Sequence, residues 1–115
     1  MRRETVSDGK RGSGKTTRAV ARCVEVARAG GNVVYVAPSY HQAIWTCRTI
    51  LKHQGPNVEV GDGRILFTSP ESLGDRVVGQ RVALMVADGA DRMKIPEEAL
   101  LSIDGDGLFM EIWDT

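Results

Sequence analysis

The sequence predicts an α/β fold in which a mostly parallel sheet is flanked by helices. Strand-like and helix-like segments alternate along the 115 residues, a length that suits a single domain over residues 1–115. Residues 32–37 and 82–87 are nearly continuous apolar runs, which is typical of strands buried on both faces. A glycine-rich loop at residues 9–16 separates the first expected strand from the first expected helix.

The first half of the chain is expected to contain two strands and two helices. Gly30-Gly31 ends the first helix, Pro38-Ser39 starts the second, and Gly55-Pro56 ends it. The predicted elements are, in order, a strand at 3–7, a helix at 15–29, a strand at 32–37 and the helix after 38–39. Spacings of three and four residues predict the buried stripe of each helix. The stripes are Val20, Cys23, Val24 and Ala27 in the first helix, and Tyr40, Ile44, Cys47 and Leu51 in the second.

The second half is expected to contain a hairpin, two short helical segments and two strands. Asp62-Gly63 lies between two short strand-like runs, as in a β-hairpin. Gly74 and Gly79 are expected to act as breakers, and Gly105-Asp106-Gly107 to precede the last strand. The predicted elements are, in order, strands at 58–60 and 64–68, a loop or short helix at 69–80, a strand at 82–87, a helix at 96–102 and a strand at 108–113.

Residues 9–16 read Gly-Lys-Arg-Gly-Ser-Gly-Lys-Thr and match the phosphate-binding pattern G-x-x-x-x-G-K-[ST]. Glycine lets the main chain turn its N–H groups toward a phosphate, and the following helix adds its positive N-terminus. Lys15 can reach the β- and γ-phosphates, and the Thr16 hydroxyl can hold Mg²⁺. The pattern predicts a nucleoside triphosphate site; the alternative is a chance match in a glycine-rich loop. The expected nucleotide contacts are Gly9, Lys10, Arg11, Gly12, Ser13, Gly14, Lys15, Thr16 and Thr17.

Asp88 closes an apolar strand downstream of this loop, which is the Walker B arrangement. Ligands of open α/β sheets bind at the carboxyl edge, so the predicted Mg²⁺ ligands are Thr16, directly, and Asp88, through a water. The alternative is that Asp88 starts a turn, because Asp-Gly-Ala-Asp is favourable turn sequence. The predicted catalytic residues are Lys15, Arg11, Asp88 and Asp91.

Four arginines are candidates for stabilising charge on the terminal phosphate. Arg11 lies inside the loop and could act within the same chain, or could be an ordinary surface side chain. Arg92, Arg76 or Arg81 could act from a neighbouring copy in an oligomer.

Residues near two predicted element ends are further candidates. Asp114 and Thr115, past the last strand, could sense the γ-phosphate. His41, Gln42 and Trp45, at the start of the second helix, could contact nucleic acid; alternatively they decorate the helix and cover the core.

The charge of the chain is zero overall but unevenly distributed. Residues 1–18 carry six Lys or Arg against two Asp or Glu, whereas residues 88–115 carry two against eight. This pattern argues against a general basic surface for nucleic acid, but it leaves room for a local patch near the loop. It suits head-to-tail self-association as a homo-oligomer, or simply a solvated polar face.

Composition places the chain among ordinary soluble globular proteins, with 42% hydrophobic and 26% charged residues. The apolar runs are too short to cross a bilayer, and the first residues lack the apolar core of a signal peptide. We therefore expect a cytoplasmic protein without membrane contact. Cys23 and Cys47 lack metal-ligand spacing and are expected to be reduced core residues.

Together these stretches resemble the ATPase domain of phage terminase large subunits and, more distantly, that of DEAD-box-type helicases. The likeness covers nearly the whole chain. Its parts are residues 9–16 for the Arg-containing P-loop, 33–43 for the strand and Ala-Pro segment, 63–67 with 78–79 ahead of Walker B, and 84–88 for Walker B. The resemblance implies a three-layer P-loop NTPase fold, ATP and Mg²⁺ as ligands, ATPase activity, and the host cytoplasm if the chain is phage-encoded. Family roles carry over to Lys15, Thr16, Arg11 and Asp88.

One position departs from this family. In those ATPases a Glu follows the Walker B Asp and orients the attacking water, whereas this chain has Gly89 at that position. General-base positioning is worth about 10²–10⁴-fold in rate, so slow turnover is expected unless another acid substitutes. Asp91 is the nearest candidate, and Glu71 and Glu111 are weaker ones.

The family architecture also implies a strand order. The strand after Walker B lies between the Walker B strand and the P-loop strand, so residues 108–113 would be central and the P-loop strand would lie at an edge. The apolar 108–113 run and the polar Arg2-Arg3-Glu4-Thr5 run agree with these positions.

Two functional hypotheses follow. One is a Mg²⁺-dependent, slow ATPase acting as an oligomer or with a nucleic-acid partner. The other is a non-hydrolysing nucleotide-binding switch or assembly protein. A small-molecule kinase is disfavoured because 115 residues leave little room for an acceptor site and a lid. The absence of an Asn-Lys-x-Asp motif favours adenine over guanine.

Overall fold

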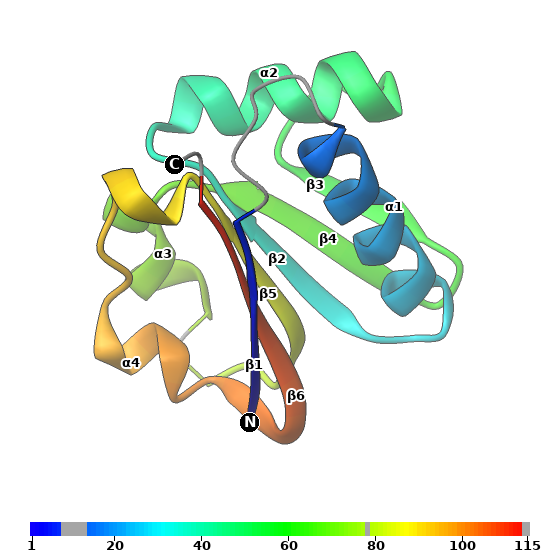
Figure 1. Ribbon diagram of the computed structural model, residues 1–115. Helices are drawn as coiled ribbons and strands as arrows, with labels where there is room; N and C mark the ends of the chain where they lie inside the picture. The colour runs from blue at the N-terminus through cyan, green and yellow to red at the C-terminus, as the bar shows by residue number, and fades with distance from the viewer. Residues whose placement is uncertain (8–13, 78, 114–115) are drawn as a thin grey trace.

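Six strands form one mixed sheet in the order β1-β6-β5-β2-β4-β3 (Figure 1). The computed structural model describes residues 1–7, 14–77 and 79–113. All neighbouring strands are parallel except β3 and β4, which form the expected antiparallel hairpin. The strands are β1 (Arg2–Val6), β2 (Asn32–Val36), β3 (Asn57–Val60), β4 (Gly63–Thr68), β5 (Val82–Asp88) and β6 (Ile103–Ile112).

Helices cover both faces of the sheet, so the α/β class with a mostly parallel sheet is confirmed (Figure 1). One apolar cluster joins α1 and α2 to one face, and a second joins α3 and α4 to the other. The strands β2, β5 and β6 contribute alternate side chains to the two clusters, which is why their apolar runs are continuous. The helices are α1 (Lys15–Arg28), α2 (Tyr40–Leu51), α3 (Pro70–Val77) and α4 (Glu97–Leu100), with a 3-10 helix η1 (Ala90–Arg92).

The last strand lies where the predicted order puts it. β6 pairs with β5 on one side and with β1 on the other, and β1 is left at the edge of the sheet. Leu108, Phe109 and Met110 are buried, whereas Arg2 and Arg3 of the edge strand are exposed. Charged side chains on an exposed edge oppose strand pairing with other molecules.

The predicted start of the last strand is wrong. β6 begins at Ile103, so the Gly105-Asp106-Gly107 turn signal lies inside the strand. Val82 pairs with Ile103 but Leu84 pairs with Leu108, so the register shifts here as in a β-bulge. A Cβ on Gly107 would lie 3.0 Å from the carbonyl oxygen of Val82, so glycine allows the two strands to approach each other at the shift.

The predicted buried stripe of α2 is also partly wrong. Tyr40 is 42% exposed, and the buried residues of this helix are Ala43, Thr46 and Cys47. The helix thus rests on the sheet through its small side chains, while Ile44 and Leu51 are only partly buried. In α1 the predicted stripe is confirmed at Val20, Cys23 and Ala27, with Val24 partly buried.

Glycine signals were misleading in the short helices too. α3 runs through Gly74, where a Cβ would meet open space, so this glycine does not interrupt the helix. Gly79, with φ of 85°, lies beyond its end. α4 is shorter than predicted and ends at Leu100. The longer helix α2 ends at Leu51 and is capped by Lys52, whose φ is 55°, so it stops before Gly55 is reached.

Candidate functional site

Thr16 and Asp88 meet at the carboxyl edge of the sheet, although 72 residues separate them. The Thr16 hydroxyl donates a hydrogen bond of 2.7 Å to Asp88 Oδ2. Thr16 lies in the first turn of α1, and Asp88 is the last residue of β5. Leu84 and Val86 of β5 point toward α1 and α2, and the alternation of the strand carries Asp88 to the same face. The structure thus brings the two predicted metal ligands together.

Lys15, the first residue of α1, is linked through Trp113 to the end of β1. Only 7% of it is exposed, and its Nζ donates to the carbonyl of Trp113 at 2.8 Å. The Trp113 N–H in turn donates to the carbonyl of Val6, at the end of β1, at 2.8 Å. Gly14 caps the helix with φ of 80°, a conformation that suits glycine. The lysine ammonium therefore lies near the carboxyl ends of β1 and β6.

Tyr35 is a second hydrogen-bond donor to Asp88, and the sequence did not single it out. It is buried in β2, stacks at a tilt against Phe67, and its hydroxyl donates to Asp88 Oδ2. Burial, and then the neighbouring carboxylate, raise the pKa of Tyr35, so the phenol stays protonated as a donor. The available signal was a Tyr in an otherwise aliphatic buried strand, because a buried Tyr hydroxyl needs a partner.

A cavity of about 170 Å³ opens beside these residues and is called the Asp88 cavity below. Two residues that the sequence linked to nucleic acid line it from α2, namely Gln42 and Trp45, and Trp45 is 60% exposed. His41 is exposed on the same helix. The polar lining of the cavity is formed by Thr16, Tyr35, Gln42, Thr46, Asp88 and Arg92.

The position after Asp88 carries no acid, and a side chain there would have to displace its neighbours. Gly89 has φ of 92°, and its N–H donates to the carbonyl of Ile112 at 3.0 Å. A Cβ there would lie 2.8 Å from Nη2 of Arg92 and 3.1 Å from Cγ of Pro38. Arg92, predicted to act on a neighbouring copy, thus lines the cavity of its own chain.

None of the alternative acids lines the described part of this cavity. Glu111 points to the opposite face of the sheet, since it alternates with the inward Met110 and Ile112, and it pairs with Arg3 at 3.6 Å. Glu71 is exposed in the first turn of α3, a helix of that opposite face. Asp91 is exposed on η1.

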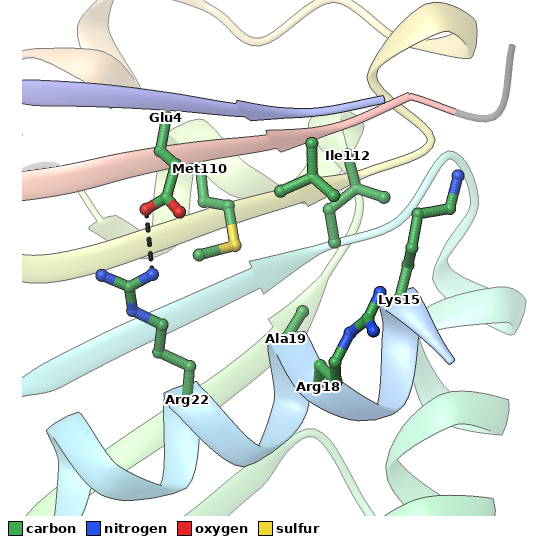
Figure 2. A pocket seen from close by; sticks show the side chains of 8 residues that line it. Glu4, Lys15, Arg18, Ala19, Arg22, Met110 and Ile112 are labelled. Carbon is green, nitrogen blue, oxygen red and sulfur yellow. Dashed lines mark hydrogen bonds and ion pairs between the residues drawn. The ribbon is translucent and has the colours of Figure 1, made fainter. Parts of the chain in front are cut away.

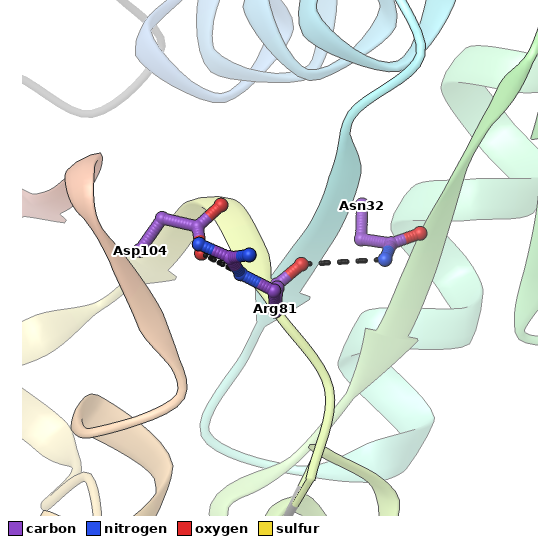
Figure 3. A network of polar contacts seen from close by, with 3 residues as sticks. All are labelled: Asn32, Arg81 and Asp104. Atoms are coloured by element: carbon purple, nitrogen blue, oxygen red, sulfur yellow. Dashed lines mark hydrogen bonds and ion pairs between the residues drawn. The ribbon is translucent and has the colours of Figure 1, made fainter.

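Arg81 lies at the other end of β5 from Asp88. Its Nε pairs with Asp104 at 2.9 Å, and its carbonyl accepts a hydrogen bond of 3.3 Å from Asn32 (Figure 3). This small polar network lies at the amino ends of the strands, so Arg81 cannot reach the Asp88 cavity of its own chain. Arg76 is exposed in the last turn of α3.

A second pocket, of about 250 Å³, lies between α1 and the strands β1 and β6 (Figure 2). Lys15, Arg18 and Arg22 line it from the helix, and Glu4 lines it from the edge strand. Arg22 pairs with Glu4 at 2.9 Å, with both side chains about two-fifths exposed, so this ion pair contributes little to stability.

Several predicted site residues lie outside the described ones. They are Gly9, Lys10, Arg11, Gly12, Ser13, Asp114 and Thr115. Thr17 is described and is exposed on α1.

The two cysteines are buried and free of disulfide, as predicted. Burial raises the pKa of the Cys23 thiol from 9.0 to about 12.

Within the described ranges, no helix is both long and apolar enough to cross a membrane. Comparison of the chain with known protein families, with curated proteins and with solved structures finds no match.

Proposed function

We propose that this chain binds Mg²⁺–ATP at the carboxyl edge of its sheet and hydrolyses it slowly, in the manner of the motor domain of phage packaging terminases. The observation that carries the proposal is the 2.7 Å contact between Thr16 and Asp88, in the order and on the strand edge that the sequence motifs require. The buried Lys15 beside them supports a phosphate ligand, because a buried ammonium favours an anionic partner.

The donor chemistry fits Mg²⁺. Thr16 and Asp88 offer hydroxyl and carboxylate oxygens, which are the ligands this ion prefers. Within the ranges that the structure describes, Asp88 does not belong to a group of three or more His, Cys, Asp or Glu that could hold a metal ion. That arrangement suits an ion that takes its remaining ligands from substrate phosphates and water. When bound, the ion would neutralise charge on the phosphates.

A non-hydrolysing nucleotide switch is the second candidate, and Gly89 favours it. A glycine cannot orient or deprotonate a water, and Arg92 lies where a side chain of residue 89 would begin. Both candidates predict nucleotide binding, and they differ only in phosphate release.

Titration calorimetry with Mg²⁺–ATP tests binding. The wild-type chain is expected to bind, and Lys15→Ala to lose most of the heat. Lys94→Ala is the matched control, since Lys94 is exposed and lines a pocket on the face of the sheet opposite Thr16 and Asp88. No heat with the wild type, or equal binding by Lys15→Ala, would contradict the proposal.

Phosphate release under single-turnover conditions separates the two candidates. Slow release that Lys15→Ala abolishes supports the ATPase, whereas no release above the buffer rate supports the switch. Light scattering with and without Mg²⁺–ATP would test the self-association that the uneven charge allows. A larger mass with nucleotide supports a nucleotide-linked homo-oligomer, and an unchanged monomer mass contradicts it.

A further inference from the structure

The guanidinium of Arg92 occupies the space that a side chain at position 89 would need. Its Nη2 lies 2.8 Å, and its Cζ 3.4 Å, from the place of a Cβ on Gly89. A turn brings the two residues together, because the Arg92 N–H donates to the carbonyl of Gly89 at 2.8 Å. The two residues therefore depend on each other, because the guanidinium of Arg92 fits only where residue 89 has no side chain.

The same guanidinium borders the Asp88 cavity together with the predicted metal ligands. Thr16 and Asp88 line this 170 Å³ space, and Arg92 is the cation in its described lining. If Thr16 and Asp88 hold Mg²⁺, the ion would neutralise the terminal phosphates of a bound nucleotide next to these two residues. The terminal phosphate would therefore lie in a small cavity that also contains the guanidinium.

The chemistry of the guanidinium decides what it can do there. It is a permanent cation with a planar fork of donors that matches phosphate oxygens. It has no acceptor, so it cannot deprotonate a water as a Glu would. With Gly89 in place of the acid and the Arg92 guanidinium beside it, the site favours binding of a highly charged phosphate over activation of a water.

We propose that Arg92 binds the terminal phosphate of the nucleotide within its own chain, so that the site distinguishes a triphosphate from a diphosphate. This inference rests on the proposed function, because it assumes that Thr16 and Asp88 mark the metal site. It differs from an arginine donated by a neighbouring copy, since no second chain is needed.

Calorimetric titration of Mg²⁺–ATP and Mg²⁺–ADP, at a protein concentration where the chain is monomeric by light scattering, tests the proposal. The wild type is expected to prefer ATP. Arg92→Ala should weaken ATP binding about tenfold and leave ADP binding nearly unchanged, because ADP lacks the group that Arg92 contacts. Arg28→Ala is the matched control: it removes an exposed arginine from the far end of α1 and should keep the preference.

Other outcomes overturn the assignment. Equal weakening of ATP and ADP by Arg92→Ala would make Arg92 a structural residue, and an unchanged ATP preference would remove its role altogether. If thermal unfolding shows that Arg92→Ala is not folded, Arg92→Lys keeps the charge without the planar fork, and it must still lower the preference for ATP. A wild type that binds both nucleotides equally refutes the inference alone, whereas one that binds neither refutes the proposed function.

Discussion

Gly89 should resist replacement, and the structure allows the cost to be worked out. Its φ of 92° is a conformation that costs a residue with a Cβ about 1–2 kcal/mol. The close approach to Arg92 adds little, because a flexible side chain can move, but Cγ of Pro38 at 3.1 Å must also shift. We therefore expect Gly89→Ala to lower the free energy of unfolding by about 1–2 kcal/mol, mainly through the main chain.

Gly74 is the matched control for this substitution. It lies inside α3 with open space around the place of its Cβ, so Gly74→Ala should stabilise the chain by about 0.5–1 kcal/mol. At about 4 °C for each kcal/mol, thermal unfolding should show the two variants shifted in opposite directions. A Gly89→Ala variant as stable as the wild type, while Gly74→Ala behaves as expected, would refute the assigned main-chain cost.

The same geometry limits how much a Glu at position 89 can raise the rate of phosphate release. Gly89→Glu should carry the backbone cost of Gly89→Ala and displace the Arg92 guanidinium. We expect no gain in phosphate release, together with a weaker preference for ATP over ADP. An increase of about 100-fold in single-turnover release, the scale of general-base catalysis, would show that the position accepts a working carboxylate after all.

Three further predictions concern the rest of the chain. Tyr35→Phe removes the hydroxyl that donates to Asp88 and should lower the free energy of unfolding by about 1 kcal/mol, measured with urea at pH 7. A urea midpoint equal to that of the wild type would contradict the assigned contact. Burial raises the pKa of the Cys23 thiol to about 12. The stability that the buried neutral thiol contributes is therefore complete below pH 9 and is lost between pH 9 and 12. Iodoacetamide at pH 8 should label Cys23 only in the unfolded chain. Deleting residues 108–115 removes the half of β6 that pairs with both β1 and β5, so it should abolish cooperative unfolding. A folded truncation that still binds nucleotide would contradict this expectation.

Much of the architecture could be predicted because apolar runs and turn signals act locally. The position of β6 between β5 and β1 also followed, from the family resemblance and from the contrast between an apolar last strand and a polar first one. The start of β6 could not be found this way, because glycine is a turn signal in sequence but allows close strand approach at Gly107. The stripe of α2 was misplaced because the spacing was followed through the larger side chains, starting at Tyr40, whereas the helix packs on the sheet through the smaller Ala43 and Thr46.

The candidate site likewise contains residues that the sequence predicts and residues that only the fold brings together. Motifs place Thr16 and Asp88, since each follows from a pattern of neighbours in the sequence. Arg92 and Tyr35 enter through the turn after β5 and the pairing of β5 with β2, which are three-dimensional relations. An arginine three residues beyond a glycine is a weak signal until the chain is seen to fold back over that glycine.

The main-chain bonds of Trp113 have a consequence for the Lys15 side chain. The Trp113 N–H donates to the carbonyl of Val6 and its carbonyl accepts from Lys15 Nζ, so the residue after β6 links the end of β1 to the start of α1. A lysine that a main-chain contact already orders has less side-chain entropy left to lose when it binds an anion. Because both bonds are made by main-chain atoms, exchanging the indole for another side chain would leave this bridge in place.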